Sequence, residues 1–143
     1  MAQFFKPQPK PKTSSTLELT IDRLDLHGVG IGRHQGKTIF VEGAMPGELI
    51  KARLTDDKKQ HGFAQLQKIL TPSPQRQTPF CPHYEQCGGC STQHLPLALQ
   101  HETKVSGVQS LFSRLAGYEL GAPEFIMTGD DQRYRRVCRL AIK

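Results

Sequence analysis

The sequence lacks tryptophan, and its other aromatic residues are few, at 7% of 143 residues. Hydrophobic residues make up 36%, which is little for a self-sufficient core. A net charge of only +6 is nevertheless too low for a wholly disordered chain. No apolar run approaches the ~20 residues of a membrane helix, and the first residues contain no apolar segment of signal-peptide length. We therefore expect neither a membrane span nor a secretion signal.

What the chain does contain is turn-forming residues and positive charge. The 13 glycines and 10 prolines favour short strands and turns over a helical bundle. The 19 basic residues exceed the 13 acidic residues, and the simplest partner of a soluble basic domain is a nucleic acid. A merely soluble basic protein is the alternative.

Residues 16–70 show the pattern of a small antiparallel barrel. Leu17, Leu19 and Ile21 alternate with polar residues, which is the period of a half-buried strand. Four further strands are predicted at 29–34, 38–41, 50–54 and 63–70, with glycines in the second where a barrel strand bends. Five strands about ten residues apart favour a mainly β fold with a barrel of the oligonucleotide-binding kind. Within it we expect Phe40 and Phe63 to fill the interior.

The rest of the chain divides into a tail, a linker and a longer C-terminal segment. Residues 1–15 alternate Lys and Pro and are predicted to be a disordered basic tail, and proline-rich residues 71–80 are predicted to be a linker. Residues 81–143 form the cysteine segment and the start of an α+β domain, with a helix over 95–116 that stops at Gly117. The last eleven residues predict a strand with one apolar face. Because such an edge invites aggregation, we expect the chain to be part of a longer protein.

The cysteines give the sharpest signal. Cys81, Cys87 and Cys90 lie within ten residues, with two glycines between the last two. Glycines allow the tight turn that two thiolates need around one metal or cluster. Four interpretations compete: an iron–sulfur cluster, a zinc site completed by His83, His94 or Cys138, a redox Cys-x-x-Cys, and a chance grouping of buried thiols. Metal is favoured, and the spacing does not choose between iron–sulfur and zinc.

The combined motifs resemble a known family. A glycine-rich barrel, then Thr-Pro-x-Cys-Pro-His-x5-Cys-Gly-Gly-Cys-x-x-Gln-His, then an Arg-Tyr-Arg-Arg strand are similar to the N-terminal part of bacterial 23S ribosomal RNA (uracil-5-)-methyltransferases. The resemblance implies that residues 16–70 are a TRAM domain. It also implies a cytoplasmic, monomeric protein that binds ribosomal RNA and not membranes.

The resemblance extends to cofactors and chemistry. Cys81, Cys87 and Cys90 would be three ligands of a 4Fe–4S cluster, with the fourth ligand beyond residue 143, and Cys138 would be a core thiol. The Rossmann-like domain that binds S-adenosylmethionine and makes 5-methyluridine would be absent from this chain. No catalytic residue is therefore predicted here, and the isolated chain should be inactive. The alternative is a stand-alone, non-enzymatic RNA-binding protein with a zinc site, and electron transfer is a weaker third possibility.

Basic and aromatic residues mark the predicted RNA contacts. Guanidinium groups bind phosphates and stack on bases, and a tyrosine ring offers a stacking surface. Lys37, Lys58 and Lys59 are weaker candidates, because a charged residue on a strand or turn is usually just solvated. The predicted RNA-binding residues are Arg133, Tyr134, Arg135, Arg136, Arg139, Lys51 and Arg53.

Overall fold

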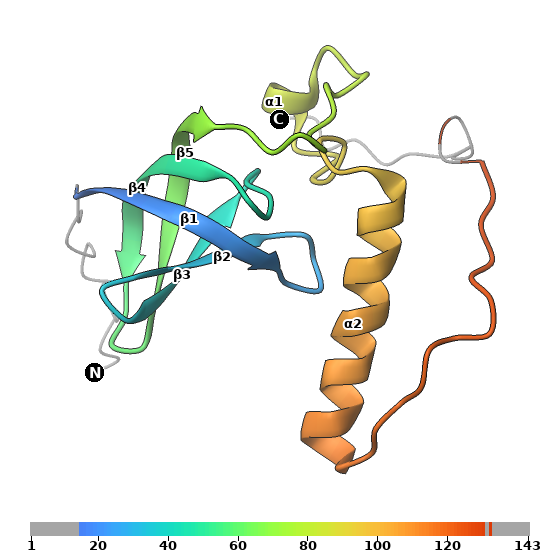
Figure 1. The fold of residues 1–143 in the computed structure, drawn as a ribbon. Helices are drawn as coiled ribbons and strands as arrows, with labels where there is room; N and C mark the ends of the chain where they lie inside the picture. The colour runs from blue at the N-terminus through green and yellow to red at the C-terminus, as the bar shows by residue number, and fades with distance from the viewer. Residues whose placement is uncertain (1–14, 131, 133–143) are drawn as a thin grey trace, which may run out of the picture.

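The computed structural model describes residues 15–130 and residue 132 (Figure 1). Its largest unit is a closed barrel with the strand order β1-β2-β3-β5-β4, in which β4 pairs again with β1. Neighbouring strands are antiparallel except β3 and β5, which are parallel. The barrel confirms the predicted mainly β fold. The strands are β1 (Thr16–Leu24), β2 (Gly30–His34), β3 (Lys37–Glu42), β4 (Leu49–Asp57) and β5 (His61–Thr71).

The barrel interior follows the alternation in the sequence. On β4, Ile50, Ala52 and Leu54 are buried, whereas Lys51 and Arg53 between them are exposed. Successive strand side chains point to opposite faces, so each strand contributes every second residue to one core. The resulting cluster contains Leu17, Leu19, Ile21, Ile39, Val41, Ala44, Ile50, Ala52, Leu54 and Ala64.

Two glycine positions shape β2 and its turn. A Cβ on Gly32 would overlap the carbonyl oxygen of Thr20 on β1, so the two strands can pass this closely only with glycine there. At the end of β2, Gln35 and Gly36 both have positive φ, 50° and 79°, between the paired residues His34 and Lys37. This two-residue turn has the backbone twist that suits antiparallel strands. The predicted hairpin turn is confirmed.

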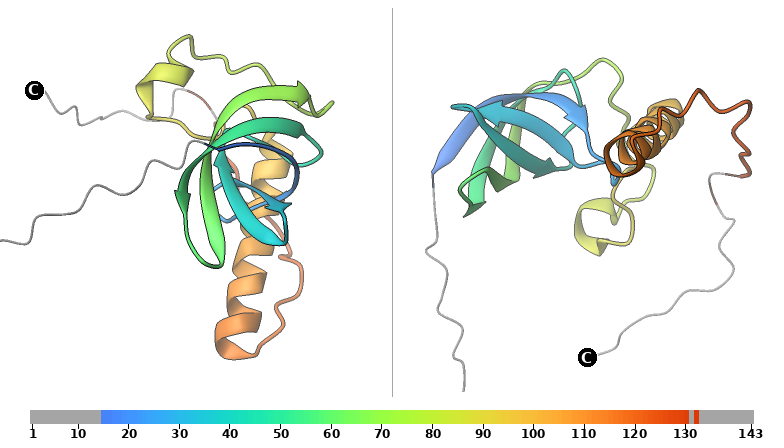
Figure 2. Two further views of the ribbon diagram at one scale, coloured as in Figure 1. Left: turned by 90° about the vertical axis from the view of Figure 1, so that its left-hand side faces the viewer. Right: turned by 90° about the horizontal axis from the view of Figure 1, so that it is seen from below.

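Two helices follow the barrel: α1 (Tyr84–Cys87) and α2 (Leu97–Ala116). Figures 1 and 2 show α2 as a long rod beside the barrel, facing the loop between β1 and β2. At the closest approach, a Cβ built on Gly107 would lie 2.6 Å from Cδ1 of Leu26. The helix ends as predicted at Gly117, whose positive φ of 62° lets its N–H bond the carbonyl oxygen of Ser113.

The apolar stripe of α2 is largely exposed to solvent. Val108, Phe112 and Leu115 are 43%, 48% and 78% exposed, and no residue of the helix is buried. The side of α2 that borders the β1–β2 loop is mixed: Leu99 and Leu111 lie there together with polar residues such as Thr103, Ser106 and Ser110. Within residues 15–130, no helix is long and apolar enough to cross a membrane.

Candidate nucleic-acid interface

The cysteine segment is an open loop with one helical turn. Helix α1 ends at Gly88 with a left-handed φ of 67°, and a Cβ there would meet nothing within 4 Å. Cys87 and Cys90 are exposed, and Cys81 is half-buried, its N–H donating to Oε1 of Gln93 at 3.2 Å. All three thiols are free.

The three thiols fit a metal cluster by their chemistry. Thiolates are the ligands of iron–sulfur clusters and of structural zinc. In the described part of the chain, however, no three Cys, His, Asp or Glu side chains come close enough together to hold a metal ion. Neither His83 nor His94 joins the thiols, so the zinc sites that these two histidines would complete are not assembled, and Cys138 lies outside the described residues.

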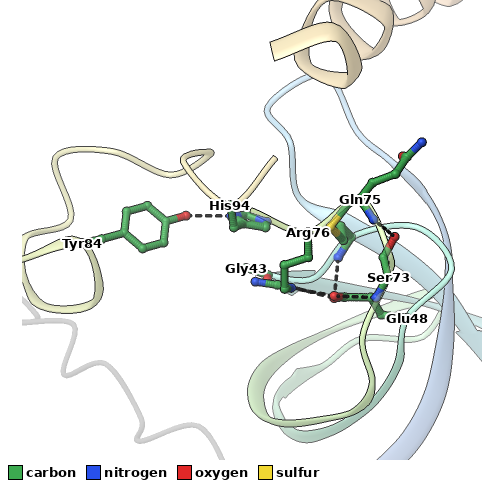
Figure 3. A network of polar contacts seen from close by, with 8 residues as sticks. Gly43, Glu48, Ser73, Gln75, Arg76, Tyr84 and His94 are labelled. Atoms are coloured by element: carbon green, nitrogen blue, oxygen red, sulfur yellow. Dashed lines mark hydrogen bonds and ion pairs between the residues drawn. The ribbon is translucent and has the colours of Figure 1, made fainter. Parts of the chain in front are cut away.

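An ion pair between a buried carboxylate and a partly buried arginine ties the segment after β5 to the barrel (Figure 3). Glu48, in the loop before β4, is fully buried. Arg76 donates to both of its carboxylate oxygens, with Nε–Oε1 at 2.6 Å and Nη2–Oε2 at 3.0 Å, and donates also to the Gly43 carbonyl oxygen at 2.6 Å. Burial would raise the pKa of Glu48, but these hydrogen bonds, that of the Met45 N–H and the Arg76 charge together hold it below its ordinary value.

His94 is the second anchor of this segment. It is fully buried, and its Nδ1 lies 2.7 Å from Oη of Tyr84, whose hydroxyl also donates to the Ser91 carbonyl oxygen at 2.8 Å (Figure 3). Burial and then the Arg76 charge lower the pKa of His94 to about 4, against weaker opposing effects of Glu48 and the Ala44 carbonyl. No hydrogen bond of normal geometry reaches Nε2 from the described residues. His94 is therefore neutral at physiological pH.

The predicted basic residues of the barrel lie on its outer surface. Lys51 pairs in register with Lys68 of β5, and Arg53 with Gln65, whose Oε1 accepts a hydrogen bond from Nη2 of Arg53 at 2.7 Å. Lys51 and Arg53 point to the same side of β4 and are exposed. The structure thus brings these two predicted RNA contacts together on one face.

Other charges near this face are partly neutralised. Nζ of Lys37 forms an ion pair with Asp57 at 2.5 Å, and Nζ of Lys58 lies 3.8 Å from Oδ2 of Asp56. Both pairs are surface pairs, which water screens and which rearrange at little cost.

The prediction that Phe40 and Phe63 fill the barrel interior is wrong for both residues. This side chain is 40% exposed, Phe40 is only half-buried, and neither belongs to the core cluster. Phe40 and Phe63 occupy outward positions on β3 and β5, because the inward positions belong to Ile39, Val41 and Ala64. The two rings stack beside His61 on the outer surface of the barrel.

The remaining predicted residues lie outside the described part of the chain. They are Arg133, Tyr134, Arg135, Arg136, Arg139 and the core thiol Cys138. Among the described residues, sequence reasoning missed the anchors Glu48 and His94. The one available signal for Glu48 was Arg76, the single charge of a proline-rich stretch, which needs a partner when the stretch packs against the barrel.

Residues 12–67, which include most of the barrel, match the TRAM domain family. Over its full length, the chain is also similar to proteins named 23S rRNA (uracil(1939)-C(5))-methyltransferase RlmD. The protein from Aeromonas hydrophila is 57% identical over 143 residues, which are 100% of this chain and 32% of that protein. The protein from Tolumonas auensis is 50% identical over 143 residues, again 100% of this chain and 32% of that protein.

A more distant relative shows the same coverage. The protein of this name from Pectobacterium atrosepticum is 42% identical over 147 residues, covering 99% of this chain and 32% of that protein. These matches confirm the resemblance to the ribosomal RNA uracil-5-methyltransferases. The chain spans about a third of the length of the curated relatives it matches.

Proposed function

We propose that this chain is the RNA-binding portion of an S-adenosylmethionine-dependent methyltransferase that forms 5-methyluridine in 23S ribosomal RNA. The observation that carries the proposal is 57% identity over all 143 residues to a protein named for that reaction. A TRAM barrel with exposed basic residues supports the RNA-binding part. The methyl transfer itself belongs to residues outside this chain, and the protein acts in the cytoplasm as a monomer.

Within this proposal the barrel and the last residues bind RNA. Lys51 and Arg53 bind phosphates from the outer face of β4, and the Arg133–Arg139 cluster with Tyr134 adds phosphate and base contacts. The proposal divides the chain into four parts: a tail at 1–15, a barrel at 16–70, a linker at 71–80 and a cluster segment at 81–143.

The RNA-binding part is tested by salt dependence. The chain should bind a fluorescein-labelled single-stranded oligouridylate at low ionic strength, as measured by fluorescence anisotropy. The logarithm of the association constant falls linearly with the logarithm of the salt concentration. Removing one basic side chain that binds a phosphate should reduce the steepness of this line by about 0.7. A Lys51→Ala/Arg53→Ala variant should therefore show a shallower slope, whereas Lys104→Ala/Arg114→Ala, which removes the same charge from α2, should not. Absence of binding at low salt would refute the proposal.

The cluster part of the proposal assigns Cys81, Cys87 and Cys90 as three ligands of a 4Fe–4S cluster. The ligand chemistry of the three free thiols supports it, as does the open turn at Gly88 between Cys87 and Cys90, and we place the fourth ligand outside this chain. A cluster has no redox role in methyl transfer, which moves no net electrons, so its role here is to order the loop.

Metal analysis after anaerobic purification tests the assignment. Iron with acid-labile sulfide, absent from Cys87→Ser and kept in the matched control Cys138→Ser, is the expected result. One zinc ion per chain would instead support a zinc-containing RNA-binding protein. Because the fourth ligand lies outside this chain, the assignment would be wrong if a longer protein that includes this ligand were purified without iron or zinc.

A further inference from the structure

Three rings gather on the outer surface where β3 and β5 run side by side. Phe40 and Phe63 are directly paired in register, with ring centroids 5.3 Å apart and planes inclined by 25°. His61 stands edge-on to both rings, at centroid distances of 6.0 Å and 5.5 Å. This aromatic cluster, Phe40, His61 and Phe63, lies outside the core, although aromatic residues are scarce in this chain.

Two members of the aromatic cluster, Phe40 and Phe63, line a concave site. This pocket has a volume of about 410 Å³, within the range of small-molecule sites. Phe40 and Phe63 supply apolar surface, while Glu42, Thr55 and Gln65 supply polar groups. Gln65 also connects the pocket to Arg53, one of the predicted phosphate contacts. Apolar ring faces with a few polar groups at the rim suit a flat ligand that carries hydrogen-bonding edges.

A lysine places positive charge over the exposed ring of Phe63. Nζ of Lys58, from the turn between β4 and β5, lies 5.3 Å from the centroid of Phe63. A cation–π contact at an exposed site is weaker than the stacking of a base on an aromatic ring. A base would therefore displace the flexible Lys58 side chain, whose ammonium group would remain close enough to pair with the adjacent phosphate.

We propose that Phe63, backed by Phe40 and His61, is a stacking platform for a base of single-stranded RNA, with Lys58 binding the neighbouring phosphate. The proposal rests on the RNA-binding function above and specifies where a base is held. The platform is tolerant of base identity because every base has a π face. A nucleotide fits better than a protein side chain because its phosphate can pair with Lys58 and Arg53, although Glu42 in the pocket and Asp56 beside Lys58 add negative charge to this face.

The first test compares two identical substitutions. Phe63→Leu keeps apolar bulk and removes the ring, and Phe125→Leu does the same at a 71% exposed phenylalanine outside the barrel. Loss of one stacked base should weaken binding of the labelled oligouridylate about five-fold or more in Phe63→Leu and leave Phe125→Leu unchanged. With an abasic oligomer of the same charge, both variants should bind like the original chain.

The second test uses the absence of tryptophan from the sequence. A Phe63→Trp variant carries a single indole at the platform, and its fluorescence should be quenched by oligouridylate and not by the abasic oligomer. This variant keeps a ring, so it remains informative if Phe63→Leu fails to fold.

The outcomes separate this proposal from the proposed function. Binding of oligouridylate with unchanged tryptophan emission and full affinity in Phe63→Leu would overturn the platform and leave RNA binding standing. That result would point to a protein partner for the aromatic face. No binding by the original chain would overturn both.

Discussion

The barrel and the segment that follows it are built on different principles. The barrel buries ten apolar side chains in one cluster, and its strands close on themselves, so it needs no covering layer. Helices α1 and α2 bury no residue at all. Between residues 72 and 130, the buried residues are Ser73, His94 and Leu95.

This difference shows what holds the second region, residues 72–130, against the barrel. A helix whose apolar side chains are exposed gains little from its own packing, because most helix stability in proteins comes from a buried face. The position of this region depends on a few contacts with the barrel: Arg76 with Glu48, the buried His94, and Gly107 against Leu26. The barrel should therefore be damaged by packing errors and the second region by removal of polar anchors.

The largest effect is expected from Gly32→Ala, which tests the barrel. The new methyl group would overlap the backbone oxygen of Thr20, and backbone cannot move aside as a side-chain end can. We expect a loss of about 3 kcal/mol or more in the free energy of unfolding, measured by urea denaturation. Gly121→Ala is the matched control, because its methyl group meets nothing within 4 Å. Equal stability of the two variants would mean that β1 and β2 are not so closely packed.

Arg76→Ala tests whether the second region in turn supports the barrel. The substitution leaves the Glu48 carboxylate buried without its cation, which costs about 3 kcal/mol. Arg53→Ala, which removes an exposed hydrogen bond to Gln65, should change stability by less than about 0.5 kcal/mol. Unfolding in urea compares them. An Arg76→Ala destabilisation as small as that of Arg53→Ala would show that residues after β5 contribute nothing to the barrel.

How much the sequence predicts also differs between the two regions. In the barrel, local alternation is enough: a period of two places Ile50 and Ala52 inside and Lys51 outside, and the Gln35-Gly36 turn fixes the register of β2 and β3. The prediction for Phe63 fails because a large apolar residue is expected inside. Period and hydrophobicity disagree at this position, and the structure follows the period.

In the second region, local patterns predict elements and not their contacts. The helix and its end at Gly117 follow from spacing and a glycine cap. The apolar stripe of α2 is exposed, and the helix contacts the barrel at Gly107, which lies against Leu26. Leu26 lies 81 positions earlier in the sequence, so a local pattern does not reveal this contact. The ion pair between Glu48 and Arg76 is equally non-local, so no pattern within a short window reveals it.

The smallest effect concerns the pH dependence of the His94 anchor. Its pKa is about 4 in the folded chain and about 6.5 when unfolded, so between these values the unfolded chain binds a proton that the folded chain does not. The contribution of His94 to the free energy of unfolding is complete above about pH 6.5. It declines as the pH falls, by about 2 kcal/mol between about pH 7 and pH 5. Glu48, whose pKa is lowered from 4.5, loses its contribution only at lower pH. His94→Gln removes the titrating ring and keeps a polar group for Tyr84, so its unfolding free energy should vary less over the same range. Parallel pH profiles of the two proteins would show that His94 takes up its proton without disturbing the fold, and that it is not a pH-sensitive anchor of the second region.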